Sequence, residues 1–285
     1  MPVSEAELST LARGHDIISL GIVADEVRKR LHGRRTTFVR VATVPADVGA
    51  TIDAPATAGE VRIAGTPATR AQAAARVAEV AAATHGIPLS AFSLADLEEV
   101  SRAEGITLRA LLEELKAAGL ELIAEAPFEQ LQDPRRSIEE VNIAGLALAR
   151  LTIGQWPVGD PVDLLKSIAT VQRQVAVVRA FAPLPRRVNP AAPTTGYDDV
   201  KRVALARVIV DSVPSIQVDW ALYGPKLAQV ALTVGADDVD AVSPIDDLSQ
   251  GPRRTALAEV RRNIIAADLD PVERNGRFEG VAQPT

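Results

Sequence analysis

Short apolar segments of strand character alternate with helical segments along most of the chain, and this alternation constrains the fold most strongly. Residues 36–44 are rich in Thr, Phe and Val, and residues 175–182 form a nearly continuous apolar run. Amphipathic helices are predicted between such runs, for example over residues 70–84 and 94–103. Strands buried on both faces and separated by helices of about 10–15 residues indicate repeated βαβ units and a parallel sheet.

The number of these units favours a barrel. The pattern predicts seven or eight strands across residues 36–242, which favours a closed or nearly closed (β/α) barrel of the TIM type over an open, doubly wound sheet. No GxGxxG follows the first strand and no GxxxxGK[ST] occurs. We expect N-terminal helices over residues 1–35 and the barrel over 36–242. A C-terminal helix and tail, residues 243–285, should pack on the barrel.

The composition excludes several classes of partner. The formal charge is −6 and the sequence holds no polybasic tract, so nucleic-acid binding is not expected. No apolar run approaches the roughly 20 residues of a membrane helix. Residues 1–9 are acidic and lack the basic start and apolar stretch of a secretory signal. A soluble, cytoplasmic protein is therefore expected.

Cysteine is absent from the whole sequence. This excludes disulfides, thiol catalysis, cysteine-ligated zinc and ordinary iron–sulfur ligation. Histidine does not compensate, because the three histidines, His15, His32 and His85, are scattered and predicted at helix ends or turns.

The C-terminal third carries motifs that are specific enough to compare with a known family. The segments that carry them are residues 194–199, 204–207, 211–216, 224–232 and 235–240, together with Trp220 and residues 271–274. They resemble the C-terminal half of aminofutalosine synthase, a radical S-adenosylmethionine (SAM) enzyme of the futalosine route to menaquinone. Residues 20–33 are similar to the family's opening helix, and residues 91–92 and 111–120 to its middle. The related cyclase of that route and the deazaflavin-forming synthase are less similar. The resemblance covers roughly residues 18–274 and implies a radical SAM-type barrel.

The chain departs from that family where the family's chemistry resides. The family carries CxxxCxxC after its first strand to hold a [4Fe–4S] cluster, whereas residues 45–59 here are mainly Ala, Asp, Thr and Pro. The glycine-rich cofactor stretch would fall at residues 124–128, where Pro127 and Phe128 are expected to obstruct close backbone approach. Where the family has a proline followed by a histidine, this chain has Pro214 followed by Ser215. We therefore predict no cofactor, meaning no [4Fe–4S] cluster and no SAM binding, and no radical SAM activity.

Three functions remain open at this stage. The first is a non-catalytic homologue that acts as a partner subunit of a catalytic homologue, or as a homo-oligomer, or that binds a pathway intermediate. The second is a cluster-independent lyase or hydrolase acting on a futalosine-like nucleoside, although no His–Asp–Ser constellation or paired-carboxylate motif supports it. The third is a small-molecule sensor that keeps the barrel mouth.

Candidate ligand-binding residues lie close to the predicted strand at residues 216–220. Gln217, Trp220 and Tyr223 are near its C-terminal end, where barrel sites lie, although core packing accounts equally for Trp220. Lys226 follows Gly224 and Pro225 at a predicted helix start, where backbone amides could hold an anion; a simple capped helix is the alternative.

Two charged groups allow similar alternatives. Arg179, with Arg186 and Arg187, is predicted at the barrel top, where the three could bind a carboxylate or remain solvated. Residues 237–240 contain three aspartates that could hold a metal, or simply form a turn and a strand.

Overall fold

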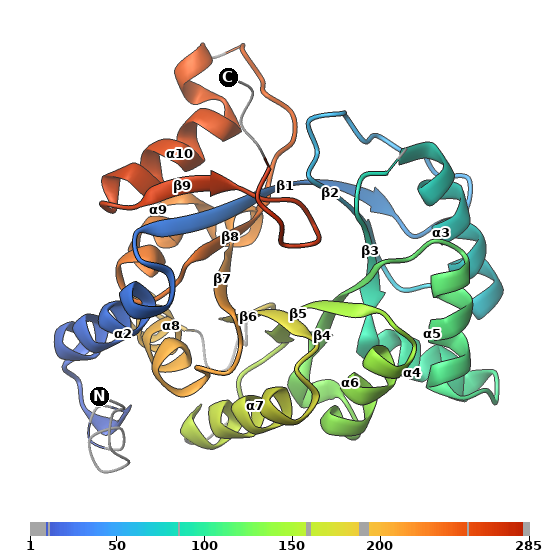
Figure 1. Cartoon of the computed structure of the whole chain (residues 1–285), viewed down its shortest axis with the longest axis horizontal. Coiled ribbons are helices and arrows are strands. Elements are labelled where there is room, and N and C mark those ends of the chain that lie inside the picture. Colours follow the sequence, from blue (N-terminus) through green and yellow to red (C-terminus); the bar gives the residue numbers. More distant parts are fainter. Residues whose placement is uncertain are drawn as a thin grey trace.

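Eight parallel strands close into a barrel in the computed structural model of the protein (Figure 1). The structure describes residues 10, 12–84, 86–157, 161–187, 194–249 and 251–281. The strands are β1 (Arg35–Pro45), β2 (Glu60–Ala64), β3 (Leu89–Ser93), β4 (Leu122–Pro127), β5 (Ala147–Ile153), β6 (Val178–Pro185), β7 (Ser215–Asp219) and β8 (Asp238–Val242). Each pairs in parallel with its sequence neighbours, and β8 pairs with β1. The predicted TIM-like barrel of the radical SAM type is confirmed.

Strand β1 closes the barrel because it is longer than its neighbours. Its second half, from Val41 to Pro45, pairs with β2, whereas its first half pairs with β8. Strand β2 does not extend along the first half of β1. The edge of β1 that is left free there pairs in parallel with a ninth strand, β9 (Asp270–Glu273). The sequence analysis did not predict β9, which is short and contains Pro271.

Helices surround the ring of strands (Figure 1). They are α2 (Ile17–His32), α3 (Arg70–Thr84), α4 (Leu94–Ala103), α5 (Leu108–Ala117), α6 (Pro134–Ile143), α7 (Pro161–Val175), α8 (Gly196–Ile209), α9 (Trp220–Thr233) and α10 (Ala256–Ala266). Short 3₁₀ helices cover Phe128–Gln130 (η1) and Pro252–Arg254 (η2). As expected, α10 packs outside the barrel, against α9 and β9. No helix in the described part of the chain is long and apolar enough to cross a membrane.

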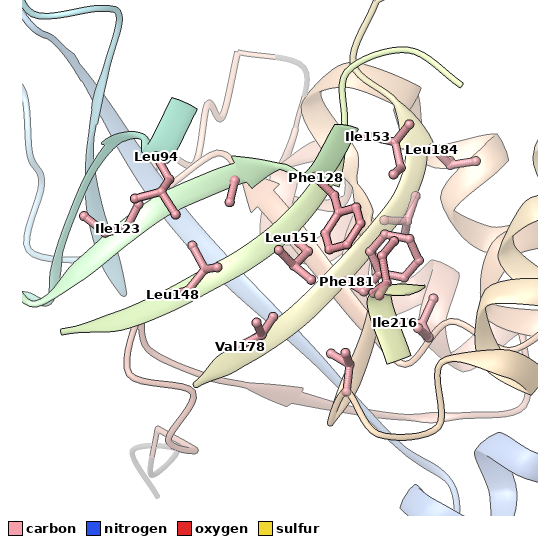
Figure 2. Close-up of a cluster of buried hydrophobic side chains, with 14 of the residues drawn as sticks. Leu94, Ile123, Phe128, Leu148, Leu151, Ile153, Val178, Phe181, Leu184 and Ile216 are labelled. Atoms are coloured by element: carbon pink, nitrogen blue, oxygen red, sulfur yellow. The ribbon is translucent and has the colours of Figure 1, made fainter. Parts of the chain in front are cut away.

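The apolar core lies between the strands and the helices. Figure 2 shows Leu151 and Phe181 from neighbouring strands packed with Phe128, which follows β4. Burying a side chain of this size contributes about 1.5–3 kcal/mol. The charged side chains of the strands lie on the opposite face, inside the barrel. The interior of the barrel is therefore polar.

Helix α2 lies within the predicted N-terminal helical region and buries one face. Leu20 and Ala24 are fully buried, whereas Ile18 and Ile22 are 73% and 57% exposed. The buried stripe packs against α8. Residues 1–9 and His85, which the sequence analysis also considered, lie outside the described residues.

The C-terminal segment covers the base of the barrel, at the N-terminal ends of the strands. After β9 the chain turns over the ring (Figure 1), and the Gly276 amide donates to the carbonyl of Gly59. Arg277 then pairs with Glu121, just before β4, at 2.6 Å. This segment covers part of the base and leaves the opposite end of the barrel open.

Candidate functional site

The open end of the barrel holds a cavity of about 590 Å³. It lies at the C-terminal ends of the strands, where barrel sites form. All eight strands, or the residue that follows one, contribute to the lining: Thr43, Arg62, Phe92, Glu125, Arg150, Arg186, Asp219 and Ala241 are among the lining residues. Three arginines and several carboxylates therefore surround one polar cavity.

A cross-barrel ion cluster forms the floor of this cavity. The fully buried carboxylate of Asp240 on β8 accepts hydrogen bonds from Arg62 Nη1 at 3.0 Å and Nη2 at 2.8 Å. It also accepts one from Arg150 Nη1, on β5. Burial alone would raise the pKa of Asp240, but the two guanidinium groups hold it well below its ordinary value. The carboxylate of Asp240 therefore links three strands across the barrel.

A second ion cluster lies at the rim. Arg186, just after β6, donates from Nη1 to Asp219 Oδ2 at 2.5 Å, and its Nε lies 3.5 Å from Glu125 Oε2. The same glutamate oxygen is 3.9 Å from Arg150 Nε. Asp219 also caps α9, since its Oδ1 accepts from the Leu222 amide at 2.9 Å. Glu125 thus lies between two guanidinium groups that it does not fully satisfy.

Arg150 and Arg186 retain unused hydrogen-bond donors. The Nε atom of each is buried and has no hydrogen-bond partner among the described residues. Burial, followed by the charge of Arg62, lowers the pKa of Arg150, whereas its partner Asp240 raises it. Such donors suit the oxygens of a carboxylate or phosphate, because guanidinium groups match these anions in geometry.

Unusual backbone conformations also occur at the cavity. Phe92 and Ala241, both in its lining, have positive φ angles of 57° and 56°. For residues with a side chain such conformations cost about 1–3 kcal/mol, and they concentrate at binding and catalytic sites. They bend the ends of β3 and β8 at the mouth.

The lower interior of the barrel contains Gln217, one of the predicted site residues. Its Nε2 donates to Asp238 Oδ2 at 2.6 Å, and its Oε1 is buried without a partner. Asp238 also accepts two hydrogen bonds from Arg274, each of 2.7 Å. Gln217 therefore lies in a filled ion network below the cavity and does not line it.

Trp220, Tyr223 and Lys226 belong to α9, outside the cavity. Trp220 and Tyr223 are half-buried and pack against the core, and the Tyr223 hydroxyl donates to the carbonyl of Pro185. Burial, with the neighbouring Asp199, raises the pKa of that hydroxyl. Gly224, with φ 74°, kinks α9 just before the exposed Lys226. Trp220 and Tyr223 thus hold α9 against the core, and any role of these three residues in ligand binding stays a prediction.

Arg179 is at the opposite end of the barrel from the place predicted for it. The strand begins at Val178, three residues later than the apolar run suggested, so Arg179 is the second residue of β6. It lines a pocket at the base. Its predicted grouping with Arg186 and Arg187 at the barrel top is therefore wrong.

The three aspartates of residues 237–240 are each paired with arginine. Asp237 binds Arg207, Asp238 binds Arg274, and Asp240 binds Arg62 and Arg150. Among the described residues, no group of three or more His, Cys, Asp or Glu could hold a metal ion. The turn-and-strand alternative describes these residues better than the metal site.

The residues present do not fit a [4Fe–4S] cluster. The loop between β1 and β2 supplies no thiolate, and its backbone is already bound: Arg76 donates from Nε to the Pro45 carbonyl at 2.9 Å and from Nη1 to the Ala50 carbonyl at 3.0 Å. The loop does not line the mouth cavity. Phe128 also stays out of the cavity, because its ring is buried in the outer core (Figure 2).

Sequence reasoning missed the principal residues of this cavity. Arg62 and Arg150 interrupt strand segments that are mainly apolar, and an arginine in a strand buried on both faces must find a counter-charge. This signal can be read from the sequence. The pairing of Arg62 with Asp240 cannot, because the two residues are 178 positions apart and only the closed barrel brings them together.

The fold places the chain in the class of closed (β/α) barrels, the fold expected from its resemblance to radical SAM enzymes. Methylornithine synthase superposes with a TM-score of 0.66 and 13% identity, covering 95% of this chain and 94% of that one. The [FeFe]-hydrogenase maturase HydG gives a TM-score of 0.62 at 12% identity, over 93% and 71% of the two chains. At these identities the likeness concerns the fold alone.

Sequence relatives are more specific. Aminodeoxyfutalosine synthase of Thermus thermophilus is 25% identical over 227 residues, which covers 69% of this chain and 61% of the relative. Cyclic dehypoxanthine futalosine synthase of Streptomyces coelicolor is 26% identical, over 64% and 50% of the two chains. The 5-amino-6-(D-ribitylamino)uracil–L-tyrosine 4-hydroxyphenyl transferase of Methanosphaerula palustris is 28% identical, over 66% and 59%.

These comparisons confirm the resemblance to the aminofutalosine synthase family and its relatives. The chain spans about three fifths of the length of the first curated relatives it matches. No family model matches the sequence.

Proposed function

We propose that this chain is a cytoplasmic small-molecule-binding barrel that carries out no radical chemistry, a pseudoenzyme among its relatives. It would bind an intermediate of the futalosine pathway, alone or as the partner of a catalytic homologue. The observation that carries the proposal is the mouth cavity, in which Arg150 and Arg186 keep unused donors while the cluster thiolates are missing.

The charges of the cavity define the ligand class. The donors of Arg150 and Arg186 favour a ligand with a carboxylate or phosphate group. Glu125 and Asp219 favour hydroxyl or amino groups nearby, which they can accept from. A polar metabolite with one anionic end and hydroxyl-bearing parts combines these properties, and aminodeoxyfutalosine, named by the relatives, is the first compound to test.

The test compares two neighbouring arginines. Isothermal titration with aminodeoxyfutalosine should show saturable binding to the unaltered protein, and Arg186→Met should weaken it roughly tenfold, the effect of losing one charge-assisted hydrogen bond. Arg187→Met is the matched control, because Arg187 is exposed and outside the cavity lining. Circular dichroism of both variants checks that they fold.

Two outcomes would contradict the proposal. Equal weakening by both substitutions would place the ligand elsewhere, and no binding of aminodeoxyfutalosine or of benzoate, a simple carboxylate, would leave the cavity without its proposed role. The partner role is tested separately, by sedimentation of the protein with and without the aminodeoxyfutalosine synthase of the same cell. Two independent boundaries in the mixture would exclude that role.

A further inference from the structure

A second pocket, of about 250 Å³, lies at the base of the barrel. Its lining includes His32 at the end of α2, Arg35 at the start of β1 and Arg179 at the start of β6. Asp237 and Arg274 lie deeper, and Phe278 of the C-terminal segment forms one wall. This pocket is separated from the mouth cavity by the ion networks that fill the barrel interior.

The buried charges of the base pocket are compensated within the protein. Asp237 accepts hydrogen bonds from Arg207, from Ser215 Oγ at 2.9 Å and from the Ile216 amide at 2.8 Å. Arg274 is paired twice with Asp238. Asp237, Arg274 and their partners therefore contribute almost no net charge to the base pocket.

The exposed arginines are not compensated in this way. Neither Arg35 nor Arg179 has an ion pair or a side-chain hydrogen bond to any described residue, although both line the pocket. They come from β1 and β6, strands that are not neighbours in the barrel. The pocket thus has two surplus positive charges, contributed by two strands that are not adjacent.

His32 adds a third potential donor. Its Nε2 is buried, makes no hydrogen bond to the described residues, and lies 3.5 Å from Asp237 Oδ2. Burial lowers the pKa of His32, Asp237 raises it, and Arg207 and Arg28 lower it again. An anion in the pocket would favour the imidazolium form, because it adds negative charge beside the ring.

We propose that the base pocket binds a phosphate-type dianion, held by Arg35, Arg179 and His32. Two guanidinium groups match the two charges and the several acceptor oxygens of a phosphate. The source is either inorganic phosphate or the phosphate end of a metabolite. This site is independent of the ligand proposed for the mouth.

The histidine supplies a direct readout. In proton NMR at neutral pH, the Hε1 resonance of His32, assigned by its loss in His32→Asn, should move downfield and saturate as inorganic phosphate or glycerol 3-phosphate is added. The resonance of His15 should not follow the same curve. Tighter binding of glycerol 3-phosphate identifies a phosphate monoester as the ligand, and equal or tighter binding of inorganic phosphate identifies the free ion.

Matched substitutions at the two ends of β6 locate the site. Arg179→Ala should weaken phosphate binding about tenfold, whereas Arg187→Ala removes the same charge beyond the other end of the strand and should leave it unchanged. Both side chains are exposed, so neither variant is expected to unfold. A linear, unsaturable shift, or equal affinities in the two variants, would overturn the proposal.

Discussion

Replacing Asp240 by asparagine would leave two buried guanidinium groups without their shared counter-charge. Asp240 is fully buried, Arg150 is 3% exposed, and Arg62 is 8% exposed. An asparagine is nearly the same size but carries no charge, and its amide nitrogen cannot accept from either arginine. The substitution therefore tests the electrostatic role of Asp240 with little change in packing.

The expected loss is large. Breaking a buried ion pair by neutralising one partner costs about 3–5 kcal/mol. With an unfolding entropy of about 2.1 cal/mol/K per residue, a loss of about 4 kcal/mol should lower the Tm of the 285-residue chain by about 7 °C. Differential scanning calorimetry measures the shift.

Asp268→Asn is the control. Asp268 pairs with Arg34 at 2.8 Å, but the two side chains are 88% and 54% exposed, and asparagine tolerates the positive φ of 61° at this position. Its Tm should not change measurably, since solvent screens exposed pairs. Equal Tm values for Asp240→Asn and the unaltered protein would refute the account of the barrel floor.

The stability difference between the protein and Asp240→Asn should also change with pH in a defined direction. Because the pKa of Asp240 is lowered in the folded protein, its ionised form contributes stability above the pKa of an unfolded aspartate, about 3.9. That contribution decreases as the pH falls below about 4. The stability difference between the protein and Asp240→Asn should therefore be full near neutral pH and shrink in acid.

Three further outcomes follow from the described contacts and from the sequence. Gly235→Ala should lower the free energy of unfolding in urea by about 2 kcal/mol more than Gly105→Ala. Both glycines have positive φ, but a Cβ at Gly235 would lie 2.7 Å from Arg207 Cβ, whereas nothing lies within 4 Å of a Cβ at Gly105. Tyr223→Phe should cost about 1 kcal/mol by removing the hydrogen bond to the Pro185 carbonyl; no change would show that this bond does not hold α9. After anaerobic reconstitution with iron and sulfide, gel-filtered protein should show no cluster absorbance, and stoichiometric iron and sulfide would contradict the ligand argument.

Most of the fold could be predicted from the sequence because local patterns specify it. The ranges predicted for α3 and α4 agree with the structure residue for residue, since apolar periodicity and flanking turn residues mark their ends. Strand β9 could not be predicted this way. Its four residues include Pro271, and its strand conformation comes from the free edge of β1.

The start of β6 shows a second limit of local patterns. Val175 and Val177 continue the apolar run of the strand, yet α7 extends to Val175 and Ala176 has a positive φ of 56°. Apolar residues occur in both elements, so hydrophobicity alone does not separate them. The three-residue difference moved Arg179 from the predicted top of the barrel to its base.

The candidate site depended on contacts between distant strands and was therefore less accessible. Asp240 was recognised as part of an acidic group, but its partners Arg62 and Arg150 lie 178 and 90 positions away. Arg186 was expected at the barrel top as a possible carboxylate ligand, and it does line the mouth cavity, but its pairing with Asp219 and Glu125 was not predicted. Register and closure bring these residues to one level of the barrel, and neither can be read from residue spacing along the chain.

Arg150 belongs both to the ion cluster of the barrel floor and to the lining of the mouth cavity. Its Nη1 completes the Asp240 cluster that joins β2, β5 and β8, while its Nε remains unpaired at the cavity. An unsatisfied buried donor costs about 1–3 kcal/mol, a penalty that the ion pairs of the cavity floor offset. A ligand oxygen that accepts from this donor would remove the penalty, and the energy so recovered would appear both as affinity and as a raised Tm. If the proposed ligand binds there, the same arginine would link the stability of the barrel to ligand binding at its mouth.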